Sequence, residues 1–229
     1  MLKKQEKFTL LNGRISMIQS LYNPTSDAVW LAAFAPKNVK TVLDVGIGTG
    51  GVSLCLFQHI PDAQITGIDV SPEMLDACKK NIELNNKKIN LINADITQWS
   101  TSECYDLVIT NPPYFQGTPV KKHNAHHNAN IVLWTKRSLA RVKANGYFCT
   151  IVDTLAMDKI LSVLCDKHVG GIQIFPLFST KNTAERVLIR AHKSVNTGTT
   201  LFQGTSMNND LILREGLTVD DMLATLVTR

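Results

Sequence analysis

Residues 41–51 read TVLDVGIGTGG. The apolar run Thr41–Val45 predicts a buried strand, and the glycines after it predict a tight turn into a helix at 52–59. The order strand, turn, helix then repeats along the chain, which predicts a parallel sheet with helices on both faces. We expect further strands at 64–70, 89–92, 105–110, 147–153, 172–178 and 186–192, and helices that begin near 26 and span 71–85, 128–142 and 155–167.

These elements predict an α/β, Rossmann-like fold with a seven-stranded, mostly parallel sheet. The last two strands, joined through Asn182–Thr183, suit an antiparallel edge pair. A short strand is expected at 13–19 and a last helix at Val219–Val227. We expect a single domain over 1–229, with an N-terminal extension at 1–38, a core at 39–194 and a tail at 195–229.

Composition excludes several classes of protein. The 229 residues are 44% hydrophobic and 19% charged, which is globular and not largely disordered. The longest apolar run, Ala28–Ala35, is too short to span a bilayer, and the N-terminus lacks a secretory h-region, so we expect a cytoplasmic protein without a membrane partner. The net charge of +5 is compatible with a nucleic-acid partner and equally with an ordinary surface. Five cysteines without a CxxC pair predict neither zinc nor a disulfide framework.

The glycine-rich turn allows three interpretations. Gly46, Gly48 and Gly51 satisfy the dinucleotide pattern GxGxxG. Asp44, two residues before Gly46, instead suits the ammonium group of S-adenosylmethionine (SAM) and would repel a pyrophosphate. The third interpretation is a plain strand-to-helix turn.

Two further aspartates follow strands. Asp69 ends the second strand of the core, where a carboxylate can accept both hydroxyls of a ribose, or can instead cap the helix near Ser71. Asp95 follows the third strand, where it can accept from an adenine amino group or simply close a turn.

The sequence Asn111-Pro-Pro-Tyr114 directly follows the fourth strand. Its two prolines fix two φ angles and remove two N–H donors, so the backbone is held extended and presents carbonyls. The Asn111 amide oxygen and the Pro112 carbonyl can both accept from one exocyclic NH2 group, while Tyr114 offers an aromatic face to a planar base. This combination predicts methylation of an amino nitrogen through positioning and electrostatics.

DVGIGTG together with NPPY resembles the class I SAM-dependent methyltransferases that act on amino nitrogens. The segment 13–36, with its SDAVWLA core, and AERVLIRAHKS (Ala184–Ser194) look like the bacterial valine-tRNA adenine-N6 methyltransferases, over most of residues 8–194. The resemblance implies a tRNA partner, N6-methyladenosine next to the anticodon as product, and SAM as cofactor.

By position, the resemblance implies roles for individual residues. The cofactor-binding residues would be Asp44, Gly46, Gly48, Gly50, Asp69 and Asp95, with Asp27 near the same pocket. The target base would be held by Asn111, Pro112 and Tyr114, and Arg186 would lie on the RNA face. The chain departs from many relatives at Val70, where they carry Glu or Asn after the ribose-binding acid.

The segment Lys121-Lys122-His-Asn-Ala-His126-His127 is either a loop that contacts RNA phosphates, through Lys121, Lys122 and His126, or a solvated polar loop. A metal site is not expected there, because no acidic or thiol ligand lies nearby. The three tryptophans are expected to pack in the core.

Four alternatives remain open at this point, one of which is a non-catalytic RNA-binding module that an activity test would exclude. An rRNA guanine-N2 methyltransferase and a release-factor glutamine-N5 methyltransferase share the NPPY chemistry, although the former often duplicates the domain and the latter usually adds a helical recognition domain. An NAD-dependent oxidoreductase would use Gly46–Gly51 but leaves NPPY without a role. The oligomeric state is not predicted.

Overall fold

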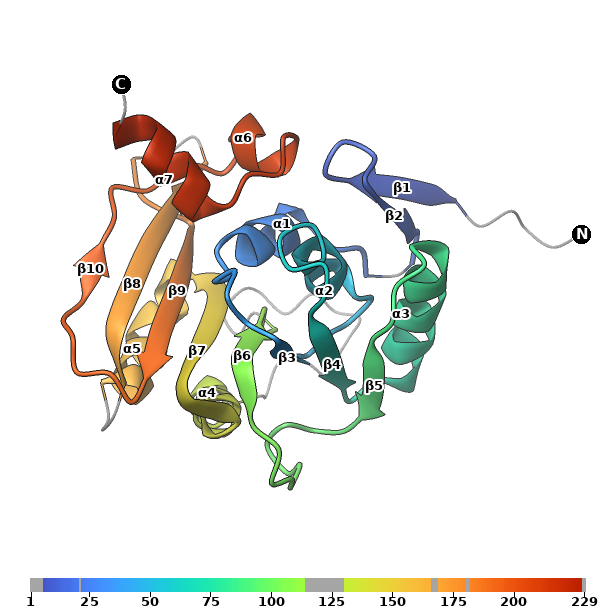
Figure 1. Cartoon of the computed structure of the whole chain (residues 1–229), viewed down its shortest axis with the longest axis horizontal. Helices are drawn as coiled ribbons and strands as arrows, with labels where there is room; N and C mark the ends of the chain where they lie inside the picture. Colours follow the sequence, from blue (N-terminus) through green and yellow to red (C-terminus); the bar gives the residue numbers. More distant parts are fainter. Residues whose placement is uncertain (1–5, 21, 114–129, 166–168, 180–181, 228–229) are drawn as a thin grey trace, which may run out of the picture.

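The computed structural model describes residues 6–20, 22–113, 130–165, 169–179 and 182–227. Its centre is a nine-stranded sheet in the order β10-β8-β9-β7-β6-β3-β4-β5, and β11 also pairs with β8 (Figure 1). The strands are β3 (Thr41–Val45), β4 (Gln64–Asp69), β5 (Asn90–Asn93), β6 (Tyr105–Thr110), β7 (Val142–Asp153), β8 (Val169–Phe178), β9 (Arg186–Lys193), β10 (Thr200–Leu201) and β11 (Thr205–Ser206).

Strand directions confirm the expected topology. The strands from β5 to β7 are parallel, while β9 runs antiparallel to both β7 and β8. The prediction of seven strands was short by two, because β10 and β11 are two-residue strands in the tail that add to β8. Such short pairings leave no alternating pattern that a sequence can reveal.

Helices cover both faces of the sheet, as predicted. They are α1 (Ser26–Ala33), α2 (Gly51–Leu56), α3 (Pro72–Leu84), α4 (Ile131–Ala140), the 3-10 turn η1 (Thr154–Ala156), α5 (Met157–Leu164), α6 (Asp210–Leu213) and α7 (Val219–Val227). Successive strand residues point to opposite faces. Val42 and Leu107 therefore pack with α1 and α2, whereas Leu43 and Val108 pack with α4 and α5. No helix among the described residues is long and apolar enough to cross a membrane.

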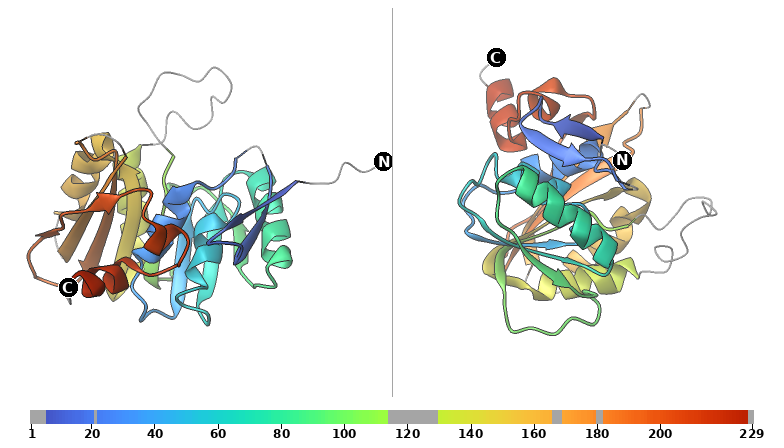
Figure 2. Two further views of the ribbon diagram at one scale, coloured as in Figure 1. Left: turned by 90° about the horizontal axis from the view of Figure 1, so that it is seen from above. Right: turned by 90° about the vertical axis from the view of Figure 1, so that its right-hand side faces the viewer.

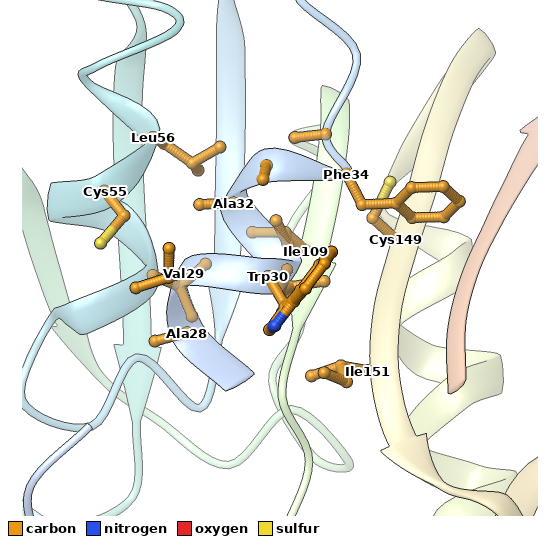
Figure 3. Packing of buried hydrophobic residues seen from close by; sticks show 14 of the residues in the cluster. Ala28, Val29, Trp30, Ala32, Phe34, Cys55, Leu56, Ile109, Cys149 and Ile151 are labelled. Carbon is orange, nitrogen blue, oxygen red and sulfur yellow. The ribbon is translucent and has the colours of Figure 1, made fainter. Parts of the chain in front are cut away.

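Helix α1 lies at the centre of the larger core cluster. Its N-cap is Thr25, whose hydroxyl accepts from the Asp27 N–H, and every residue of the helix after Ser26 is buried. In Figure 3, α1 lies between α2, which contributes Cys55 and Leu56, and the strands that carry Ile109, Cys149 and Ile151. A helix that is apolar all round requires such cover on every side.

An N-terminal hairpin docks on α3 (Figures 1 and 2). It consists of β1 (Lys7–Leu10) and β2 (Ile15–Ile18), of which the sequence predicted only the second. Asn85 accepts from the Ser16 N–H and donates to the Ser16 carbonyl, as a neighbouring strand would. Asn81 accepts from the Ile18 N–H at 2.8 Å and donates to the Thr49 carbonyl at 2.9 Å. The hairpin is thereby linked to the glycine-rich turn.

The C-terminal tail packs on the core. The Trp30 indole N–H donates to the Met207 carbonyl at 2.9 Å. Arg190 of β9, only 8% exposed, forms two hydrogen bonds to the carboxylate of Asp220 in α7, at 3.0 and 3.1 Å. The tail therefore neutralises a cation that the sheet buries.

Candidate functional site

The carboxyl ends of three adjacent strands bring three of the predicted polar residues to one edge of the sheet. Asp44 lies in β3 next to its end, Asp69 ends β4, and Asn111 follows β6. Since β3 lies between β4 and β6, this edge contains the point where the chain changes direction across the sheet. Ligands of open α/β sheets bind in the crevice at that point.

The turn after β3 forms a cradle of backbone. Gly46, Gly48 and Gly50 have φ of +73°, +54° and +89°, which side chains other than glycine rarely adopt. The N–H groups of Gly46 and Ile47 donate to the Ile68 carbonyl, which ties the turn to β4. An added Cβ at Gly50 would lie 2.8 Å from the Cys78 sulfur of α3. Gly50 is therefore required for shape as well as for conformation.

Asp44 is a buried carboxyl at the base of this cradle, 1% exposed. The Ser53 hydroxyl donates to its Oδ2 at 2.7 Å. Burial raises the pKa of Asp44 to about 7, the Ser53 hydrogen bond opposes this rise, and the charge of Asp69 adds to it. A buried carboxyl with so high a pKa is suited to a cationic ligand, which would stabilise the ionised form. The site therefore fits the ammonium group of an amino-acid moiety.

Asp69 has the role at the start of the helix near Ser71 that the sequence offered as one interpretation, and ribose binding stays a prediction. Its Oδ2 accepts from the Gly48 N–H and its Oδ1 from the Ser71 N–H, each at 2.9 Å. The carboxylate thus holds the cradle and the start of α3 at once. Each carboxylate oxygen has a second lone pair, so both can still accept from ribose hydroxyls.

Asp95 closes a turn beyond β5. Its Oδ1 accepts from the N–H and the hydroxyl of Thr97, both at 2.8 Å. The turn interpretation is therefore realised in the structure. Cofactor binding by Asp95 stays a prediction.

Asn111 presents a buried acceptor that has no partner among the described residues. Its side-chain Oδ1 is inaccessible to solvent and makes no hydrogen bond there. Pro112 beside it is buried as well. A buried polar atom without a partner costs about 1–3 kcal/mol, so a ligand that supplied a donor to this atom would be stabilised here. Tyr114 lies outside the described residues, as do Lys121, Lys122 and His126.

Trp134 of α4 joins the cradle to the target segment. Its indole N–H donates to the Thr110 hydroxyl at 3.1 Å, and that hydroxyl donates to the Val45 carbonyl. The same ring lies 3.2 Å from the position of a Cβ on Gly46. The sequence predicted only a packing role, because no motif links residue 134 to residues 46 and 110.

Asp27 and Arg186 form an ion pair with a nitrogen–oxygen distance of 3.3 Å, and Arg186 also reaches Asp153 at the end of β7. The start of α1 lies against the cradle, since a Cβ on Gly51 would meet Pro24 and Ala28. The structure thus gives both residues a structural role. Their predicted roles in cofactor and RNA binding stay predictions.

The sequence profile of one family, the methyltransferase small domain, matches residues 25–157. The chain belongs to the methyltransferase small domain family. The matched region contains the cradle, Asp44, Asp69, Asp95 and the NPP segment. Among described residues, no group of three or more His, Cys, Asp or Glu side chains is placed to hold a metal ion.

A relative of this family from Glaesserella parasuis, named tRNA1(Val) (adenine(37)-N6)-methyltransferase, is 29% identical over 155 residues. The alignment covers 64% of this chain and spans 65% of the length of that relative. Relatives with the same name occur in Flavobacteriaceae and Escherichia.

Two solved structures share the fold. One is a predicted O-methyltransferase from Agrobacterium tumefaciens, with a TM-score of 0.66, 22% identity and coverage of 80% of this chain and 88% of the other. The second is a putative class I SAM-dependent methyltransferase from Listeria monocytogenes, with a TM-score of 0.60, 19% identity and coverage of 87% and 67%. The fold is therefore that of the class I methyltransferases.

Proposed function

We propose that this protein transfers the methyl group of SAM to the exocyclic N6 of an adenine in tRNA, next to the anticodon of a valine tRNA. The observation that carries the proposal is the buried Oδ1 of Asn111, which has no partner among the described residues and lies beside the Pro112–Pro113 backbone. This oxygen can accept a hydrogen bond from an N–H group, and an exocyclic amine has two N–H groups. The names of the relatives support adenine in tRNA as the acceptor.

The cofactor would be held by the cradle and its two carboxyl groups. Asp44 would bind the ammonium group and Asp69 the ribose hydroxyls, while the backbone at Gly46–Gly50 allows close approach. When bound, the cofactor supplies an electrophilic methyl group. Asp44 contributes most to binding in its ionised form, so a bound cation must lower its pKa from about 7.

The target segment orients the amine. Asn111 Oδ1 and the Pro112 carbonyl would each accept one hydrogen from the NH2 group, which turns the nitrogen lone pair out of the plane of the base. Two prolines fix the backbone that carries these acceptors, so little reorganisation is needed when charge develops on the nitrogen. The methylated nitrogen would lose its extra proton to water after transfer, so no strong general base is required.

Guanine-N2 and glutamine-N5 are acceptors with the same chemistry, and the names of the relatives favour adenine over both. The family match and the NPP geometry disfavour the dinucleotide interpretation of the glycine-rich turn. An NAD-dependent oxidoreductase would leave the Asn111 acceptor without a role.

Methyl transfer from labelled SAM tests the proposal. The protein is incubated with an unmodified valine tRNA transcript and with bulk tRNA, and the RNA is digested to nucleosides. We expect label in N6-methyladenosine. Label in a guanosine product would overturn the adenine assignment, and transfer to a release factor but not to RNA would overturn the RNA assignment.

Two asparagine variants make the test specific. Asn111→Ala should lower kcat by about 100-fold or more, because it removes an acceptor used in the transition state, while SAM affinity changes less than about twofold. Asn208→Ala serves as the matched control, since Asn208 is exposed in the tail. Equal activity of the two variants would refute the role of Asn111.

A further inference from the structure

The outward face of α4 combines an apolar side chain with two cations. Leu133 is 37% exposed, although it is a large hydrophobic residue. Lys136 and Arg137 are exposed as well, and they lie three and four positions farther along the helix. Residues at these spacings share one helix face. We call Leu133, Lys136 and Arg137 the α4 strip.

The α4 strip lies on the helix that contacts the reaction centre. Trp134 follows Leu133 in sequence and is turned from it by about 100° around the helix; it donates to Thr110 and lies 3.2 Å from the position of a Cβ on Gly46. A helix with its side chains is about 10–12 Å across. The strip is therefore within reach of the one or two nucleotides that flank a base held at Asn111.

The cations of the strip lack acidic partners among the described residues. Two other surface lysines are paired, Lys37 with Asp221 at 2.7 Å and Lys143 with Asp106 at 2.8 Å, whereas Lys79 and Lys80 of α3 form no ion pair among the described residues. Neither Lys136 nor Arg137 forms such a pair in the described part of the chain, and α4 itself contains no Asp or Glu. The α4 strip thus presents uncompensated positive charge next to an exposed apolar surface.

We propose that the α4 strip is a docking surface for the single-stranded RNA that flanks the methylated base. This inference rests on the proposed function and adds a surface to it. Lys136 and Arg137 bind backbone phosphates, with the guanidinium able to engage two phosphate oxygens. Leu133 packs against the face of an unstacked flanking base. Asn111 then selects the amine, while the strip fixes the strand that carries it.

The test compares two double variants that lose the same charge. Lys136→Ala/Arg137→Ala removes the cations of the strip, and Lys79→Ala/Lys80→Ala removes two adjacent exposed lysines of α3. The probe is an unmodified valine tRNA transcript, with Kd measured from 50 to 200 mM salt. For the strip variant we expect Kd to rise about tenfold or more and the slope of log Kd against log salt to fall by about 1.4–1.8, as for two lost phosphate contacts. The α3 variant should change Kd less than about threefold.

Three controls separate the possible outcomes. SAM affinity and melting temperature should be unchanged in both double variants, because the altered side chains are exposed. Leu133→Ser should raise KM for tRNA about threefold or more, whereas Leu201→Ser, at a leucine 70% exposed in β10, should not. Equal effects of the two double variants would show that only overall charge matters and would overturn the inference. A wild-type protein that binds no tRNA would overturn the proposed function as well, so the two failures are distinguishable.

Discussion

Ionisation of Asp44 should lower the free energy of unfolding and, at the same time, favour binding of the cofactor. Its pKa is raised from 3.8 to about 7 by burial. Between these values the folded protein holds a proton that the unfolded chain has lost, so this group destabilises the fold as pH rises. At 1.36 kcal/mol per unit, the full penalty above pH 7 is about 4 kcal/mol as an order of magnitude.

Asp44→Asn removes this penalty while keeping an oxygen for the Ser53 hydroxyl. The variant should be more stable than the wild type, and its advantage should grow by about 2 kcal/mol between pH 5.5 and pH 8. For a protein of this size that corresponds to a widening of the gap in melting temperature by about 4–8 °C. Comparison of two proteins at each pH cancels the titration of every other group.

Thermal melts with and without S-adenosylhomocysteine provide the assay. The ligand should raise the melting temperature of the wild type and leave Asp44→Asn unchanged, because the variant lacks the charge that pairs with the ammonium group. An Asn variant that melts below the wild type at pH 8 would refute the reasoning. So would a gap that does not change with pH.

Three further outcomes are expected. Gly50→Ala should weaken SAM binding, measured by calorimetry, about tenfold or more, because the φ of +89° and the Cys78 sulfur both oppose a side chain. Adding Cys78→Ala removes the contact with sulfur but not the backbone strain, so it should restore only part of the affinity. Arg186→Gln should cost about 2 kcal/mol or more in urea unfolding, since it leaves the buried Asp27 without this cation, and Asp27→Asn in the same chain should recover part of the loss. Trp134→Phe keeps a ring on Gly46 but removes the donor to Thr110, so SAM affinity should fall several-fold, and an unchanged Kd would contradict the link between cradle and target segment.

Local patterns predicted the central elements well. The strands Thr41–Val45 and Tyr105–Thr110 and the helix Val219–Val227 have their predicted bounds. The start of α3 was also predicted, because a Ser-Pro pair is a strong N-terminal signal; Ser71 caps the helix and Pro72 begins it. These features depend on neighbours in sequence, which is why sequence patterns suffice.

Features that depend on distant residues were missed or misplaced. The predicted helix at 128–142 overruns α4, and Val142 instead begins β7, which is irregular near Asn145 at a positive φ of 59°. Strand β1 was missed although its alternating pattern was available in KFTL. The sequence correctly placed Asp44, Asp69 and Asn111 at strand ends. The burial of Asp44 and the contact of Trp134 with Gly46 depend on packing between distant elements, which the spacing of residues in the sequence does not reveal.

The pairing of Arg190 with Asp220 has a consequence for the order in which the chain becomes stable during synthesis. Arg190 lies in β9, between β7 and β8, and its guanidinium also donates to the Phe34 carbonyl. Its carboxylate partner, Asp220, follows 30 residues later in the chain. A buried cation without a counter-charge is costly, so the antiparallel end of the sheet should close only after α7 has been synthesised, whereas the parallel half around β3 can assemble earlier.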